Sequence, residues 1–191
     1  MGIQLLHVAK SFGDQRLFTD LNLTFREGCV SCLMGASGSG KTTLVSMLMG
    51  LEKPDSGEIR GVEGKRIAAV FQEDRLIEHW DAVRNVKLAC ARAVTRQEIE
   101  EGLKKVGIDE GRKKAVRQFS GGMRRRVAIV RALLAESDIL ILDEPFKGLD
   151  EETKKQVMAY VKENTRGKTV LLVTHDRGEA EEFGAEPVVI S

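Results

Sequence analysis

The chain has 191 residues, of which 42% are hydrophobic and 31% charged, and its formal net charge is +1. This length fits one domain with a substantial buried core. The balanced charge gives no reason to expect a nucleic-acid partner, no apolar run is long enough to span a membrane, and the first residues lack the layout of a signal peptide. We therefore expect a cytoplasmic protein.

The amino-terminal third of the chain is rich in strand signals. Apolar or alternating segments predict strands at Ile3–Val8, Phe18–Phe25 and Cys29–Met34. A helix over Thr42–Met49, a turn at Pro54–Gly57 and a short strand at Ile67–Phe71 follow. We expect this β-rich region to be antiparallel at its amino end.

Three cysteines, Cys29, Cys32 and Cys90, are the only ones in the chain. The CxxC spacing of the first two raises a redox or metal interpretation. Residues three apart on a strand face opposite sides, however, and no second Cys/His pair lies nearby. We expect buried, unreactive thiols.

The segment Gly35–Thr42, between the third strand and the helix, matches the pattern GxxxxGK[ST] in full. Its glycines let the backbone wrap phosphates, Lys41 offsets the charge of the β- and γ-phosphates, and Thr42 offers a hydroxyl to Mg²⁺. Thr43 adds a hydroxyl toward the α-phosphate. The predicted nucleotide contacts here are Gly35, Ala36, Ser37, Gly38, Ser39, Gly40, Lys41, Thr42 and Thr43.

Helical periodicity dominates from about Gln72 to Gln118, and α/β alternation resumes after Ser120. Helices are predicted at Ala82–Ala93, Arg96–Val106, Met123–Leu134, Glu151–Glu163 and near Arg177–Phe183, and strands at Ile139–Leu142, Thr169–Val173 and Pro187–Ile190. We predict a single α/β domain, a P-loop NTPase with a mostly parallel sheet covered by helices on both faces. Residues 1–72 and 123–191 would form its core, and residues 73–122 a helical subdomain.

Polar side chains follow three of the predicted strands where catalytic groups collect in open α/β sheets. Asp143 ends an apolar strand and suits Mg²⁺, and Glu144 is placed to act as a general base on water. His175 ends the next strand and should point at the γ-phosphate. Gln72 ends Ile67–Phe71 and could join them as a polar ligand to Mg²⁺ or water.

Ser120-Gly121-Gly122-Met123 opens a long helical segment and has the character of half a phosphate site. A helix N-terminus with free backbone N–H groups attracts anions. The complete phosphate loop nevertheless lies far away in the sequence. The residues alone leave open which phosphate this second cradle would bind.

Six motifs occur in a fixed order along the chain. They are GASGSGKT, Val70-Phe71-Gln72, Phe119-Ser120-Gly121-Gly122-Met123, ILILDEP, Gly148-Leu149-Asp150 and Val173-Thr174-His175-Asp176. Together the six motifs resemble the ATP-binding cassette (ABC) ATPase family over essentially the whole chain. The amino-acid sequence around Gln72, Ser120 and Asp143 is similar to that of import-type cassettes of the nitrate, sulfonate and taurine group.

This resemblance implies further roles. Phe12 matches the aromatic residue that stacks on adenine, with a core phenylalanine as the rival interpretation. Two cassettes of the family pair head to tail, so that Ser120, Gly121 and Gly122 face the ATP of the partner chain, and Asp150 crosses the same interface. Both sites would be complete in a homodimer, which is the favoured assembly.

Three positions depart from the family pattern. Met123 stands where many members have Gln, which leaves Ser120 and the backbone donors intact. Lys147 and Gly148 stand where small residues are common. Lys147 either adds positive charge near the interface or is simply solvated, and we favour solvation.

The resemblance implies an ATPase subunit that uses ATP and Mg²⁺ to drive a transporter of the import type, with separate permease subunits in the membrane. The chain would then be peripheral to the inner face of the cell membrane. Gln72 opens a docking segment, Glu73–Asn85, in which Trp80 is either an anchor or a packing residue. The alternative is a soluble cassette ATPase that acts in assembly, for example of iron–sulfur clusters. The cargo is not readable from this chain.

Overall fold

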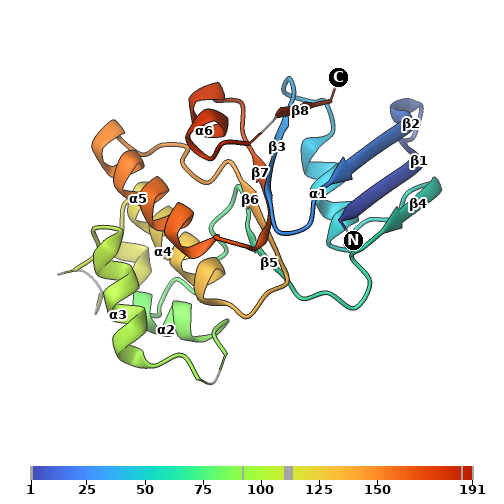
Figure 1. Cartoon of the computed structure of the whole chain (residues 1–191). Helices are drawn as coiled ribbons and strands as arrows, with labels where there is room; N and C mark the ends of the chain where they lie inside the picture. Colours follow the sequence, from blue (N-terminus) through green and yellow to red (C-terminus); the bar gives the residue numbers. More distant parts are fainter. Residues whose placement is uncertain (1, 92, 110–113, 186, 191) are drawn as a thin grey trace.

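A computed structural model describes residues 2–91, 93–109, 114–185 and 187–190. Its centre is a five-stranded parallel sheet with the order β5-β6-β7-β3-β8 (Figure 1). These strands are β5 (Ile67–Val70), β6 (Ile139–Asp143), β7 (Thr169–Val173), β3 (Val30–Met34) and β8 (Pro187–Val189). All residues of β6 and β7 are buried, as expected for central strands that are covered on both faces.

Alternation along β6 shows how the two cores are separated. Leu140 and Leu142 belong to one hydrophobic cluster, and Ile139 and Ile141 to another on the opposite face, because successive strand residues point to opposite sides. The first cluster packs against helices α2 to α5. The second packs against α1 and a further sheet.

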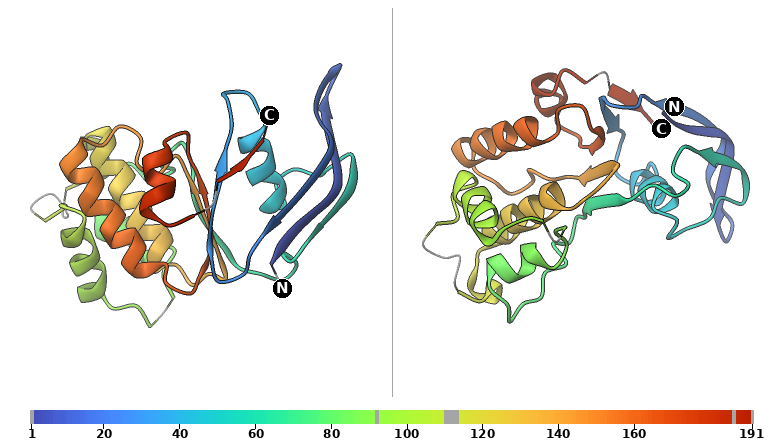
Figure 2. Two further views of the ribbon diagram at one scale, coloured as in Figure 1. Left: turned by 45° about the horizontal axis from the view of Figure 1, so that its top comes forward. Right: turned by 60° about the horizontal axis from the view of Figure 1, so that its bottom comes forward.

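That further sheet is antiparallel and has the order β2-β1-β4. It consists of β1 (Ile3–Phe12), β2 (Gln15–Phe25) and β4 (Ser56–Arg60). Helix α1 (Lys41–Leu48) lies between the two sheets (Figure 2, left). The predicted antiparallel region at the amino end is therefore confirmed.

The opposite face of the parallel sheet carries most of the helices. They are α2 (Ala82–Lys87), α3 (Arg96–Lys105), α4 (Gly121–Leu134) and α5 (Glu151–Asn164), with a 3₁₀ turn η1 at Val116–Gln118 and α6 (Arg177–Glu182) near the carboxyl end. Side chains cap several of these helices: Ser120 Oγ accepts a hydrogen bond from Met123 N at 3.2 Å at the start of α4. Thr95 and Glu98 form a capping box on α3.

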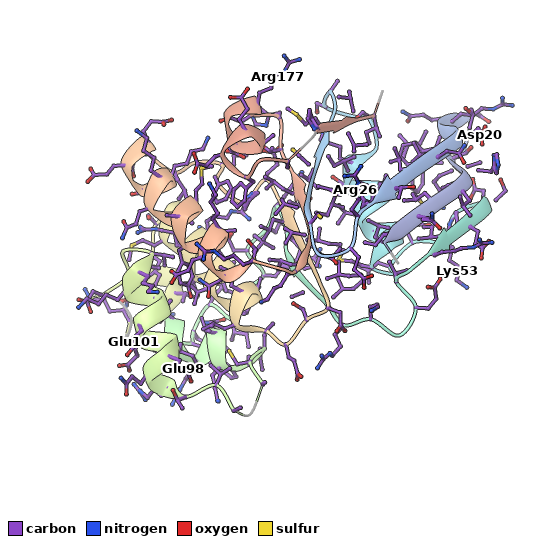
Figure 3. All side chains as sticks on the ribbon, viewed as in Figure 1. Asp20, Arg26, Lys53, Glu98, Glu101 and Arg177 are labelled. Atoms are coloured by element: carbon purple, nitrogen blue, oxygen red, sulfur yellow. The ribbon has the colours of Figure 1, made fainter. Side chains whose placement is uncertain are left out.

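The six residues labelled in Figure 3 are all exposed. Glu98 and Glu101 project from α3, and Arg177 projects from the start of α6. Within the described residues, no helix combines the length and the apolar character that a membrane crossing requires.

The predicted fold class is confirmed, but three local predictions are wrong. The Pro54–Gly57 turn runs into a strand, β4, that was not predicted, because most of its side chains are exposed and show no alternation. Helix α2 ends at Lys87 rather than at Ala93, since Cys90 pairs as a β-bridge with Ala135. Cys29 is exposed before the start of β3, whereas Cys32 is buried and Cys90 is partly buried.

Candidate nucleotide site

The phosphate loop joins β3 to α1 with the geometry that its sequence predicts. Gly40 caps α1 with φ of 91° and no side-chain hydrogen bond, so the first backbone N–H groups of the helix carry no capping side chain. A Cβ at Gly40 would lie 2.4 Å from the Phe18 ring, and therefore only glycine fits there. Lys41 Nζ donates to the carbonyls of Gly35 and Ala36 at 2.7 and 2.8 Å, which holds its ammonium group over the loop.

Parallel register brings the other predicted residues to the same edge of the sheet. Asp143 ends β6 opposite Val173 of β7, and Leu33 of β3 lies opposite the same Val173. The segments that follow these strands therefore leave the sheet at the same edge. They contain Gly35 after β3, Gln72 after β5, Glu144 after β6 and His175 after β7. This is the carboxyl edge of the sheet, where open α/β folds bind ligands.

Glu144 and His175 form a pair at this edge. His175 Nδ1 lies 2.9 Å from Glu144 Oε1 and 3.0 Å from Oε2. The Glu144 residue is buried, whereas the His175 side chain is 68% exposed. The backbone of Glu144 has φ of 48°, a conformation that is unusual for a residue with a Cβ. Strained residues of this kind collect at functional sites, where neighbouring contacts hold them in place.

Asp143 is the last residue of β6 and is 3% exposed. Its burial and the neighbouring charge of Glu144 raise the pKa of the carboxyl group, while a hydrogen bond from Gln72 and the charges of Arg125 and Lys41 act in the opposite direction. Asp143 Oδ1 has no hydrogen-bond partner among the described residues. A buried, unsatisfied carboxylate oxygen is poised for a cation.

The donor set at this edge fits Mg²⁺. This ion prefers oxygen ligands and is usually held by one or two carboxylates together with phosphates and water. Asp143 supplies the carboxylate, Thr42 a hydroxyl and Gln72 an amide oxygen. Within the described part of the chain, no group of three or more His, Cys, Asp or Glu side chains that could hold a metal ion is present.

A pocket of about 490 Å³ lies at this edge, and the buried Asp143 is not among the described residues that line it. The predicted residues that line it are Phe12, Gly35, Ser37, Gly38, Gly40, Lys41, Thr42, Thr43, Gln72, Glu144 and His175. Phe12 is 49% exposed, which excludes its interpretation as a core residue. Ala36 contributes a carbonyl to Lys41, and Ser39 Oγ is buried without a partner among the described residues.

Sequence reasoning missed two residues that line the pocket and left a third undecided. Gln15 and Leu17 come from β2, and Gln15 pairs with Phe12 across the hairpin. The available signal was the Gly13-Asp14 pair, which is typical of a turn but does not give the register of the strands. Lys147 is exposed, as expected for a solvated lysine, but it also lines the pocket beside Glu144.

The second cradle lies elsewhere on the molecule. Ser120, Gly121, Gly122 and Asp150 are not among the described residues that line the pocket. Ser120 and Gly121 are exposed at the start of α4, and Asp150 is exposed at the start of α5, where its Oδ1 accepts from Thr153 N at 2.9 Å. One chain therefore presents a phosphate pocket and a separate, open helix N-terminus.

The fold and the pocket define a nucleotide-binding protein of the P-loop class. A family model described as "ABC transporter" matches residues 18–147. The chain belongs to this family, as its motifs indicated.

Curated relatives agree with this assignment. A sulfate/thiosulfate import ATP-binding protein of Xanthomonas campestris pv. campestris is 34% identical, over 100% of this chain and 62% of that protein. The glycine betaine uptake system ATP-binding protein of Escherichia coli K12 is 38% identical, over 93% and 64%. An aliphatic sulfonates import ATP-binding protein of Pseudomonas syringae is 42% identical, over 93% and 65%. The chain thus spans about three fifths of the length of these relatives.

Solved structures match over a larger share of their length. A dimeric ATP-binding cassette in a post-hydrolysis state, bound to ADP and Pi, has a TM-score of 0.86 and 30% identity, covering 99% of this chain and 94% of that one. A dimeric bacterial ABC transporter cassette has a TM-score of 0.85 and 30% identity, covering 98% and 94%.

Proposed function

We propose that this chain is the ATP-hydrolysing subunit of an ABC transporter and that it energises transport through separate membrane subunits. The observation that carries the proposal is the Glu144–His175 pair, which stands at the edge of a pocket that also holds Lys41 and the phosphate loop. A base and a phosphate clamp at one pocket suit the hydrolysis of a nucleoside triphosphate.

Each residue of the pocket has a chemical role in this proposal. The loop N–H groups and Lys41 bind the phosphates, and Phe12 stacks on the adenine ring. Thr42, Gln72 and Asp143 would hold Mg²⁺, which neutralises phosphate charge when bound. Glu144 accepts a proton from the attacking water, and His175 orients the Glu144 carboxylate and faces the γ-phosphate.

The exposed cradle supports a functional dimer. Two chains related by a two-fold axis would place Ser120, Gly121 and Gly122 of one chain against the ATP of the other, and Asp150 would cross the same interface. Dimers of both solved cassettes support this arrangement. Each nucleotide would then be held by two chains.

The relatives favour transport, and import in particular. The three relatives described above are named as ATP-binding proteins for sulfate or thiosulfate, glycine betaine and sulfonates. Because these cargoes differ, they support the transport role without selecting a substrate. We propose that the chain is peripheral to the inner face of the cell membrane and docks on permease subunits through Glu73–Asn85.

The region between β5 and α4 has the helical character that such docking requires. We propose that residues 73–122 form a helical subdomain inserted into a core of residues 1–72 and 123–191. Trp80 is partly buried, and together with Arg84, Lys87 and Leu88 it lines a shallow depression of about 380 Å³. Leu88, at 60% exposed, adds apolar surface that a partner helix could cover.

Phosphate release from ATP, measured for the wild type and for Glu144→Gln, tests the catalytic assignment. The variant should bind ATP but lose nearly all hydrolysis, since its amide cannot accept the proton. Glu152→Gln, an exposed change at the start of α5, is the matched control and should hydrolyse at the wild-type rate. Undiminished hydrolysis by Glu144→Gln would exclude Glu144 as the base.

A mixed dimer tests the role of the cradle across the interface. One chain carries Ser120→Arg, whose long cation would fill the partner's phosphate region, and the other chain is wild type. We expect one of the two sites to lose hydrolysis. Equal hydrolysis at both sites would contradict a cradle that acts on the partner's nucleotide.

A further inference from the structure

Two arginines of α4 hold the segment that carries Gln72. Arg125 is only 8% exposed, and its guanidinium group donates to the backbone carbonyls of Phe71 and Gln72. Arg131 donates to the carbonyls of Asp74 and Arg75, both at 2.8 Å. Four carbonyls of one short segment, which follows β5, are therefore bound by one helix.

An ion pair adds to these hydrogen bonds between α4 and residues 71–75, which we call the arginine clamp. Arg125 Nε lies 3.3 Å from Asp74 Oδ1, and both side chains are largely buried. Burial raises the pKa of Asp74, while the charges of Arg125, Arg124 and Arg131 act to lower it. A buried guanidinium must find acceptors for its donors, so this position strongly prefers arginine. The backbone at Arg75 is also unusual, with φ of 47°, and its guanidinium group stacks on the Phe71 ring at 3.7 Å.

Gln72 connects the clamp to the metal site. Its backbone carbonyl is bound by Arg125, and Gln72 lines the pocket together with Lys41 and Glu144, where its side chain acts to lower the pKa of Asp143. Gln72 is exposed and lies two residues beyond the end of β5, a strand of only four residues, so the hydrogen bonds of that strand do not hold it. The place of the Gln72 amide in the pocket therefore depends on the position of the Arg125 guanidinium.

We propose that Arg125 is a positioning residue for ATP hydrolysis: it acts through Gln72 and sets the place of the Gln72 amide beside Asp143. The inference rests on the proposed function. It also has a consequence for the dimer, because α4 begins at Ser120. One rigid helix then links the cradle offered to the partner's ATP with the Gln72 amide at the chain's own site.

A double-mutant cycle between Arg125 and Gln72 separates this role from general support of the fold. Arg125→Met removes the donors, and Gln72→Ala removes the exposed amide that they position. Each change should lower kcat on the order of tenfold, as is typical for residues that orient metal ligands. If Arg125 acts through Gln72, the double variant should be no slower than the slower single variant. Multiplied losses of activity would overturn the proposal.

Nucleotide binding, measured by calorimetry, supplies a readout that is independent of turnover. Without Mg²⁺, Arg125→Met should bind ATP with a Kd within about twofold of wild type, because the phosphate loop and Lys41 are untouched. With Mg²⁺, the Kd of Arg125→Met for ATP should be higher than that of the wild type and equal to that of Gln72→Ala. An equal loss of affinity in both conditions would indicate a distorted fold and would overturn the proposal.

Two further variants complete the design. Arg124→Met removes a neighbouring guanidinium that, among the described residues, makes no hydrogen bond to residues 71–75, and it should keep wild-type kcat. Arg125→Lys keeps the charge but not the paired donors, and its kcat should lie between those of the wild type and Arg125→Met. If Arg125→Met does not fold, the same cycle is run with Arg125→Lys. A wild-type chain that releases no phosphate from ATP would refute the proposed function. An Arg125→Lys variant that hydrolyses ATP as fast as the wild type would refute only the positioning role of Arg125.

Discussion

Asp143 is the residue at which stability and function conflict most directly. Its carboxyl group is buried at the end of β6, and its pKa is raised by that burial and by the charge of Glu144. The folded chain therefore holds this proton more tightly than the unfolded chain does. The stability of the nucleotide-free protein should fall as the pH rises from the ordinary aspartate range through this raised pKa, and the loss remains at neutral pH.

Asp143→Asn removes the buried charge. We expect a higher Tm for the nucleotide-free variant at neutral pH and complete loss of hydrolysis. Asp138→Asn is the matched control, because a backbone hydrogen bond from Arg66 lowers the pKa of Asp138. Loss of the Asp138 carboxylate should therefore lower the Tm. Thermal unfolding at neutral and acidic pH measures both changes in Tm. A lower Tm for Asp143→Asn would show that the ionised carboxylate stabilises the empty site.

Lys147 is a cation that the sequence left undecided between solvation and function. It lines the pocket near Glu144, where the γ-phosphate would lie. Lys147→Ala should weaken ATP binding by about 1 kcal/mol, roughly fivefold in Kd, and weaken ADP binding less. Titration of both nucleotides measures the difference, with Lys155→Ala on α5 as the control. Equal weakening of ATP and ADP would leave Lys147 with no role at the γ-phosphate.

At the scale of elements, Asn85 holds the segment that precedes α2. It is fully buried, accepts from Ile77 N at 2.7 Å, and donates to the carbonyls of Ile77 and Asp81 at 3.1 and 3.0 Å. One side chain thus bonds several backbone groups of a loop that lies outside the regular helices and strands. This bonding gives the proposed docking segment a fixed shape.

Asn85→Ala would leave Ile77 N without its acceptor, whereas the carbonyls of Ile77 and Asp81 keep the backbone donors Trp80 N and Asn85 N. The free energy of unfolding should fall by about 2 kcal/mol, because one backbone N–H group loses its partner and two further hydrogen bonds of a buried side chain are removed. Asn164→Ala removes one hydrogen bond, to Tyr160 O at the end of α5, and should cost only about 1 kcal/mol. Denaturant titration of the two variants compares these costs. Equal destabilisation would contradict a special role for Asn85.

Local patterns explain which elements were predictable. The phosphate loop, the buried strand β6 and the capped helix α4 carry their signals within a few residues, so their positions and their shared sheet edge followed from sequence. The strand β4 did not, since its pairing with β1 is non-local and its residues are mostly exposed. The end of α2 depends on a bridge between Cys90 and Ala135, which are far apart in the chain.

The same distinction applies to the site. Lys41, Asp143, Glu144 and His175 were predictable because a parallel sheet aligns the ends of its strands. The contacts of Arg125 with Phe71 and Gln72 were not, because they join segments more than fifty residues apart through packing of α4. The exposure of Cys29 was also missed, since the strand begins one residue later than its apolar pattern suggested.

On the scale of the whole molecule, the pocket and the cradle of one chain lie apart. The pocket contains the phosphate loop and Glu144, whereas Ser120, Gly121 and Gly122 lie at the start of α4 and are not among the described residues that line it. In the proposed dimer, the cradle of one chain would complete the pocket of the other. We therefore expect ATP binding to promote dimerisation of the chain.

Light scattering of the Glu144→Gln chain with ATP and Mg²⁺ shows whether nucleotide joins two chains. We expect a dimer with ATP, a monomer with ADP or without nucleotide, and a monomer when Ser120→Arg is added to the same chain, although that variant still binds ATP. A Glu144→Gln chain that is saturated with ATP and remains a monomer would exclude a dimer held together by ATP.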